Sequence, residues 1–317
     1  MRHLLTIGLL ATLVVVLVLL TVLVAPGFLS EVESEPEQVQ YLIGVSQANL
    51  IEPWRITMNR EIEAAAAQHD GLRVIFTDAT QNTDRQLEDV RMLQGYGIDL
   101  LVISPNDGEA LRPIISQVFR QIPVIVLDRD VLGDEYTLFI GPNNYQIGQL
   151  AGDLVARMLD GKPGNVVEIL GIESSPPVEE RSRGFSDALV DYPNITIVQR
   201  LVADWMQDQA EDRMKEYLVI SQKDTDIVFA QNDAMAYGAY IAVSKFRVPG
   251  VRFVGVDGLE GTNGGRDLVR KGILEATFNC PTGGRQAIEY ALRILKEEKG
   301  LPYRLILDPV EITADTL

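Results

Sequence analysis

From residue 41 onward, short runs of Val, Ile and Leu alternate with longer segments in which apolar residues recur at helical spacing. The short runs have the length and composition of strands buried on both faces, and the longer segments match amphipathic helices. The expected strands are residues 41–45, 73–77, 100–103, 124–127, 137–140, 165–170, 196–202, 227–230, 252–256 and 275–278. The expected helices are residues 54–69, 83–96, 111–121, 147–159, 180–191, 206–221, 234–246, 264–271 and 282–299.

Continuous apolar strands separated by helices are typical of parallel sheets that carry helices on both faces. The strands form two series, one ending near residue 140 and the other starting near residue 165. Each series has enough strands for a sheet of its own. The pattern therefore predicts an α/β fold with two similar doubly wound parallel-sheet lobes rather than one large sheet.

The amino-terminal end has a different pattern, because residues 4–24 contain no charged side chain. A helix needs roughly 20 apolar residues to span a bilayer, and Arg2 before the run favours a cytoplasmic amino terminus. We expect a membrane anchor or signal segment at residues 1–25 and an acidic linker at 26–38, with the remainder extracytoplasmic. The sequence after Val24 is a poor cleavage site, which favours an uncleaved anchor, but a cleaved signal remains open.

Charge and residue counts exclude several classes of site. The formal net charge is −17, which disfavours nucleic acid and anionic lipid as partners, since both require clustered Lys and Arg. Cys280 is the only cysteine, so no intramolecular disulfide can form. His3 belongs to the apolar end, which leaves His69 alone and removes a two-histidine metal site. We therefore expect no metal and no cofactor.

Polar residues directly follow many of the predicted strands, as at Ser46, Asp128-Arg129, Asn232-Asp233 and Asp257. Each one alone is an ordinary turn or helix-capping residue. In open parallel sheets, however, ligands bind beyond the carboxyl ends of the strands. Their shared position in both lobes therefore predicts a ligand site between the two sheets.

These strand ends also resemble a known family. The matching stretches are Gly44–Gln47 with Pro53-Trp54-Arg55, Ile122–Arg129, Gly161–Gly171, Glu180–Phe185, Ala230–Gly238 and Gly255–Gly258. Their order and spacing from residue 41 to about 310 resemble the periplasmic sugar-binding proteins of the ribose and galactofuranose type. Those proteins share their fold with the sensory domains of LacI-like repressors. The Trp54-Arg55 pair favours the galactofuranose-binding branch.

The resemblance implies two lobes joined by a three-strand hinge. The amino-terminal lobe would comprise residues 39–142 and 280–305, and the carboxy-terminal lobe residues 143–279 and 306–317. It also implies a monomer that delivers its ligand to the permease of an ABC transporter or to a sensor kinase. The chain departs from the family at Asn279 or Cys280, where relatives often carry a long polar residue. It also departs at residues 174–177. Because of these two departures, the resemblance does not identify the sugar.

A sugar site requires rigid hydrogen-bonding groups for hydroxyls and aromatic rings for the C–H faces. Arg129 and Arg181 offer forked donors, and Trp54 and Trp205 could sandwich the ligand when the lobes close. The expected ligand-binding residues are Ser46, Trp54, Arg55, Asp128, Arg129, Arg181, Trp205, Asn232, Asp233, Asp257 and Asn279. The arginines and aspartates balance, which favours a neutral monosaccharide such as a hexose, a pentose or a galactofuranose.

Three alternatives differ in class. Asp128 and Asp257 could in principle hydrolyse a glycoside, but neighbouring arginines lower carboxyl pKa values and weaken a general acid, so we expect no catalysis. The stretch 258–265 lacks the spacing and the Lys of a phosphate-binding loop. A repressor would need a DNA-binding amino terminus in place of the apolar run. A sensory protein that signals to a membrane receptor kinase remains open beside a transport protein.

Overall fold

The computed structural model describes residues 40–131, 133–221 and 224–317. The first of its two six-stranded sheets is parallel throughout. In spatial order its strands are β11 (Arg304–Leu307), β5 (Leu138–Pro142), β4 (Val124–Leu127), β3 (Leu100–Ser104), β1 (Tyr41–Gln47) and β2 (Leu72–Asp78).

The second sheet is parallel except at one edge, where β12 runs antiparallel to β10. Its spatial order is β12 (Glu311–Thr313), β10 (Ala276–Asn279), β9 (Arg252–Asp257), β8 (Ile227–Ala230), β6 (Gly164–Leu170) and β7 (Ile195–Val202). The two sheets therefore repeat the same pattern, which confirms the expected pair of α/β lobes.

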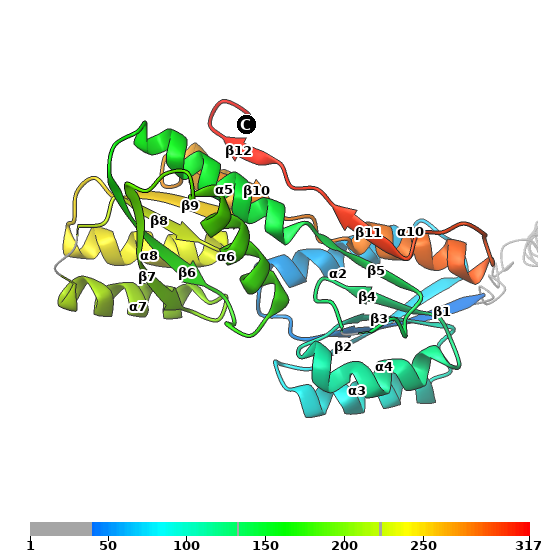
Figure 1. The fold of residues 1–317 in the computed structure, drawn as a ribbon. Coiled ribbons are helices and arrows are strands. Elements are labelled where there is room, and N and C mark those ends of the chain that lie inside the picture. The colour runs from blue at the N-terminus through cyan, green and yellow to red at the C-terminus, as the bar shows by residue number, and fades with distance from the viewer. Residues whose placement is uncertain (1–39, 132, 222–223) are drawn as a thin grey trace, which may run out of the picture. The chain divides into compact units, whose positions relative to one another are not determined.

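Helices cover both faces of each sheet (Figure 1). On the first lobe, α2 (Pro53–Ala66) packs beside α10 (Gly284–Leu295), and α3 (Thr83–Gly95) packs beside α4 (Gly108–Phe119) on the other face. The second lobe carries α5 (Asn144–Leu159) with α6 (Pro176–Ala188), and α7 (Gln207–Ile220) with α8 (Asp233–Phe246) and the short α9 (Gly265–Arg270).

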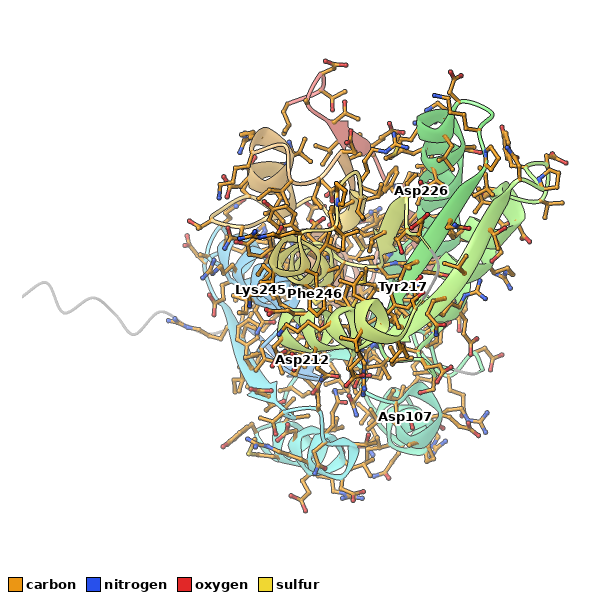
Figure 2. All side chains as sticks on the ribbon, turned by 90° about the vertical axis from the view of Figure 1, so that its left-hand side faces the viewer. Asp107, Asp212, Tyr217, Asp226, Lys245 and Phe246 are labelled. Atoms are coloured by element: carbon orange, nitrogen blue, oxygen red, sulfur yellow. The ribbon has the colours of Figure 1, made fainter. Side chains whose placement is uncertain are left out.

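The helices form where the sequence supplies caps and amphipathic spacing. Asn82, Asp107 and Asn232 each accept a hydrogen bond from a main-chain N–H in the first turn of the helix that follows. On α7, Asp212 is exposed on the outer surface, whereas Tyr217 is buried against the sheet (Figure 2). Strands β3 and β4 are buried along their whole length, which explains their continuous apolar sequence.

The chain passes between the two sheets three times: from β5 to α5, from β10 to α10 and from β11 to β12. The sequence pattern did not predict β11 and β12. In β11, exposed and half-buried residues alternate, so this edge strand carries no apolar run. Within the described residues, none of the helices is long and apolar enough to span a bilayer. The membrane segment expected at residues 4–24 lies outside the described residues.

Candidate functional site

A pocket with a cavity volume of about 30 Å³ lies where the two lobes face each other, at the carboxyl ends of the strands. This volume is well below the range for small-molecule sites, so the lining side chains nearly fill the pocket. We call it the inner pocket. Its lining residues are Glu52, Trp54, Arg55, Asp128 and Arg129 from the first lobe and Pro177, Arg181, Trp205, Asn232 and Asp257 from the second.

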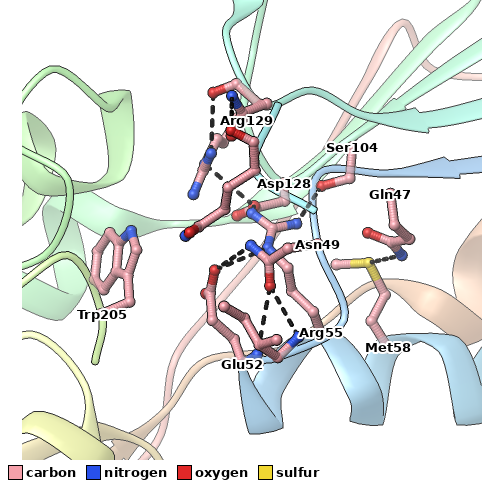
Figure 3. Close-up of polar contacts among 12 residues, drawn as sticks. Gln47, Asn49, Glu52, Arg55, Met58, Ser104, Asp128, Arg129 and Trp205 are labelled. Carbon is pink, nitrogen blue, oxygen red and sulfur yellow. Dashed lines mark hydrogen bonds and ion pairs between the residues drawn. The ribbon is translucent and has the colours of Figure 1, made fainter. Parts of the chain in front are cut away.

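Arg55 is the centre of a polar cluster on the first lobe (Figure 3). Its Nη1 donates to Ser104 Oγ at 2.7 Å, its Nη2 donates to Asp128 Oδ2 at 2.9 Å, and its Nε lies 3.4 Å from Glu52 Oε1. Burial acts to lower the pKa of Arg55, but the two carboxylates outweigh it, so the pKa is raised. Arg55 is therefore a fully charged side chain whose charge is already neutralised by protein groups.

Asp128 and Arg129 are placed by a tight turn at the end of β4. The main-chain N–H of Arg129 donates to the carbonyl of Leu127 at 3.0 Å, and Asp128 has a φ of 72°, which L-residues rarely adopt. Such a conformation is costly and is typical of functional sites. The turn brings both side chains into the lining of the inner pocket, and Figure 3 shows Asp128 beside Arg55.

Arg129 is much less well compensated than Arg55. Its Nη1 donates to the carbonyl of Asn106 at 3.0 Å, and its Nε lies 3.9 Å from Asp128 Oδ2, beyond hydrogen-bonding distance. The side chain is only 3 % exposed. Burial and the neighbouring Arg55 together lower the pKa of Arg129 to about 10. Arg129 thus has unused donors and a charge that the protein only partly balances.

Arg181 is the matching guanidinium on the second lobe. Its Nε donates to Asn144 Oδ1 at 2.9 Å, its Nη1 donates to the carbonyl of Gln231, and its Nη2 donates to Cys280 Sγ at 3.2 Å. A guanidinium has five N–H groups, so two remain for a ligand. The contacts fix the plane of the guanidinium without using all its donors.

Two aromatic rings line the inner pocket, one from each lobe. The Trp54 indole N–H donates to the carbonyl of Cys280 at 2.8 Å, which joins α2 to the second of the three lobe crossings. Trp205 has φ 69° and lies flat against Gly171, where a Cβ atom would stand 2.0 Å from the indole ring. Only glycine at position 171 permits this approach.

Asp257 is a buried carboxyl group on the second lobe, with Asp233 behind it. Burial and repulsion from Asp233 raise the pKa of Asp257 well above its ordinary value. Burial also raises the pKa of Asp233, although hydrogen bonds from Thr277 and Gly258 oppose the rise. The carboxyl group of Asp257 lines the pocket, so a ligand hydroxyl could reach it.

Comparison with known proteins identifies the family. Residues 43–299 match the family model of the periplasmic binding protein domain. The chain belongs to the periplasmic binding protein family. It is 32% identical over 232 residues to the ribose import binding protein of Escherichia coli (strain K12), covering 72% of this chain and 76% of that protein. The sequence resemblance is therefore confirmed.

Two further relatives support the assignment. The galactofuranose-binding protein of Escherichia coli (strain K12) is 26% identical over 276 residues, which cover 84% of this chain and 85% of that protein. The fructose-binding periplasmic domain of a hybrid two-component system superposes with a TM-score of 0.82 at 36% identity, covering 87% of this chain and 91% of that one. Membership of a family of binding proteins agrees with the expectation that the chain is not an enzyme.

The structure of this periplasmic binding protein brings together most of the residues predicted for the site. The predicted residues that line the inner pocket are Trp54, Arg55, Asp128, Arg129, Arg181, Trp205, Asn232 and Asp257. Asn232 caps α8 through Met235 N, and its amide N–H holds the carbonyl of Trp205 at 3.0 Å. Within the described part of the chain, no cluster of His, Cys, Asp and Glu side chains has the arrangement of a metal site.

Three predicted residues lie elsewhere. Ser46 is fully buried, and its hydroxyl accepts from Gln86 Nε2 at 3.2 Å. Asp233 is committed to the protein, because it accepts from Thr277 Oγ1 at 2.7 Å and from Gly258 N at 2.8 Å. Asn279 lines a different hollow, between Glu61 and Arg285. The structure therefore places these three outside the inner pocket and gives Asp233 a supporting position behind Asp257.

Glu52 and Pro177 line the pocket but were not predicted. Glu52 directly precedes Pro53-Trp54-Arg55, and its three-residue spacing to Arg55 at a helix start was an available signal. Pro177 lies in the first turn of α6, one turn before Arg181. No general rule marks such a proline as a contact residue.

Proposed function

We propose that this periplasmic binding protein binds one neutral monosaccharide in the inner pocket and delivers it to an ABC transporter. The observation that carries the proposal is the composition of the pocket lining, which combines three guanidinium groups, three carboxyl groups and two indole rings from both lobes. Arginine forks and carboxylates pair with vicinal hydroxyls, and indole rings cover the C–H faces of a sugar ring.

The charge balance favours an uncharged sugar. The lining holds three arginines and three carboxyl groups, so the second carboxylate beside Arg55 offsets the surplus of Arg129 and Arg181 over Asp257. A sugar phosphate would add about two negative charges, for which the lining has no matching surplus of cations. An amino sugar would add a positive charge, and the lining has no pair of free carboxylates to bind it. Three of the relatives are named for ribose, galactofuranose and fructose, which are all uncharged sugars.

The test is a thermal-shift and calorimetric screen of the purified full-length protein in detergent. D-ribose, D-fructose, L-arabinose, D-allose, D-galactose and myo-inositol form the panel, with D-ribose 5-phosphate and D-glucosamine as charged controls. Ten hydrogen bonds of about 1 kcal/mol each, less the cost of association, correspond to a micromolar Kd. Stabilisation by an uncharged member is expected, and stabilisation only by a charged control would refute the neutral-sugar proposal.

A second candidate function is sugar sensing. The fructose-binding domain that superposes on this chain is part of a two-component system, and a retained anchor at residues 1–25 would suit either role. Deleting the gene and measuring uptake of the radiolabelled sugar separates the two. Loss of uptake supports transport, whereas normal uptake with lost transcriptional induction by that sugar supports sensing.

The lobes are proposed to close around the sugar at the three crossings, with residues 39–142 and 280–305 in one lobe and 143–279 and 306–317 in the other. The ligand can drive closure because it would contact side chains of both lobes at once. Small-angle scattering with and without the stabilising sugar measures the change, and an unchanged radius of gyration would contradict closure.

A further inference from the structure

Trp205 carries an unused hydrogen-bond donor at the inner pocket. Five buried side-chain polar atoms lack a hydrogen-bond partner among the residues that the structure describes: Gln47 Oε1, Thr77 Oγ1, Asp89 Oδ2, Trp205 Nε1 and Gln231 Oε1. Of these, only Trp205 Nε1 belongs to a residue that lines the inner pocket. Trp205 is 6 % exposed, so its N–H has little access to solvent. Buried donors are rarely left unsatisfied without a functional reason.

The other tryptophan provides an internal comparison. The Trp54 N–H is already engaged by the carbonyl of Cys280 at 2.8 Å. Trp54 can therefore offer a ligand its ring but not its N–H. The two rings, which the sequence suggested as equivalent halves of a sandwich, differ in hydrogen-bonding state.

The packing of Trp205 limits stacking on its ring. One face lies on Gly171, and the Arg181 guanidinium carbon is 5.5 Å from the ring centroid. In Figure 3 the ring nitrogen lies on the edge of the indole that faces Arg129 and Asp128, and no contact reaches it. Asn232 holds the main-chain carbonyl of Trp205, and Asp204 and Trp205 both have positive φ values, so the ring is held in one place.

We propose that Trp205 recognises the sugar through its indole N–H, as a specificity-determining donor to one ligand oxygen, and that Trp54 supplies the stacking surface. This inference rests on the proposed function and refines it. Arg181 lies over the same ring with two unused N–H groups. The oxygen that Trp205 binds, or its vicinal neighbour, is therefore within the reach of Arg181 as well. A sugar that lacks that oxygen would leave two buried donors unpaired.

The chain has two tryptophans, which makes a direct test possible. Full-length protein labelled with ¹⁵N at the indole nitrogen gives one resonance from each, assigned with Trp54→Phe and Trp205→Phe. In the free protein, the Trp54 N–H is expected to be protected from hydrogen exchange and the Trp205 N–H to exchange faster. D-ribose, D-fructose and D-galactose are then titrated separately. The sugar that raises Tm is expected to shift the Trp205 resonance downfield and to slow its exchange.

Affinity provides the second measurement. Trp205→Phe keeps an aromatic ring but removes the donor, and about a tenfold rise in Kd is expected for the stabilising sugar. The monodeoxy analogues of that sugar identify the oxygen, because one of them should bind Trp205→Phe and the wild type with the same Kd. If a sugar raises Tm but leaves the Trp205 indole resonance and its exchange unchanged, the donor role is refuted and the proposed function stands. If no sugar raises Tm or moves either resonance, both are refuted.

Discussion

Replacing Arg129 by Met should make the free protein more stable and its ligand binding weaker. Burial and the nearby Arg55 lower the pKa of Arg129 from its ordinary value to about 10, which corresponds to a charge penalty of about 3 kcal/mol in the folded state. The hydrogen bond from Arg129 to the carbonyl of Asn106 offsets about 1 kcal/mol of it. Met fills a similar volume without the charge. The free variant should therefore gain about 1–2 kcal/mol, or a few degrees in Tm.

The same change should weaken sugar binding about a hundredfold. The unused donors of Arg129 face the inner pocket, so their loss leaves two sugar hydroxyls without partners, at about 3 kcal/mol. Urea denaturation of the free protein and calorimetry with the stabilising sugar measure the two effects. Arg183→Met is the matched control, because Arg183 is exposed and rests on Tyr145, with its guanidinium carbon 5.2 Å from that ring. A variant at Arg129 that is destabilised by more than about 1 kcal/mol and binds normally would refute this reasoning.

Three other predictions concern two buried carboxyl groups and the amino-terminal segment. Because burial raises the pKa of Asp257, ionising this carboxyl group destabilises the folded wild type increasingly as pH rises above 3.8. The gain in the free energy of unfolding from Asp257→Asn, measured in urea, should therefore increase from pH 4 to pH 7. A gain that is independent of pH would contradict this. Arg200→Met should lower the free energy of unfolding by about 3 kcal/mol, because it removes the Nε donor that lies 2.8 Å from the fully buried Glu168. Arg213→Met is the control, since Arg213 pairs with Glu216 on the exposed surface and its loss should change the stability little. On fractionation of the host the protein should remain with the membranes, and soluble protein that begins beyond Ala25 would show that the segment is cleaved.

The sequence predicts the buried parallel strands well because their pattern is unambiguous. Residues 124–127 and 227–230 are continuous apolar runs, and β4 and β8 occupy those same residues. Asp128-Arg129 was selected for the site because it directly follows such a run. In contrast, β11 and β12 are short and half-exposed edge strands, and long-range pairing rather than local pattern determines them.

The placement of side chains in the site depends on details that a sequence does not carry. Asn279 and Cys280 are adjacent at the end of β10, and both line the separate hollow. Cys280 also bonds to two residues of the inner pocket, because its Sγ accepts from Arg181 and its carbonyl accepts from Trp54. The sequence did not decide between these two neighbours, and the structure places Asn279 in the separate hollow rather than in the inner pocket. Likewise, Asp233 follows β8 as the pattern predicted, but only the fold shows that Thr277 and Gly258 occupy its oxygens.

The contacts of Cys280 connect three residues of the inner pocket to one of the lobe crossings. Cys280 lies at the second crossing and bonds to Trp54 of the first lobe, to Arg181 of the second, and through its N–H to the carbonyl of Asp257. In this structure, all three residues are tied to the crossing. A ligand shifts the equilibrium between open and closed forms only through contacts that differ between them. Arg129 and Trp205 have no bond to Cys280 among the described residues, and we propose that their contacts with a sugar contribute to the coupling between binding and closure.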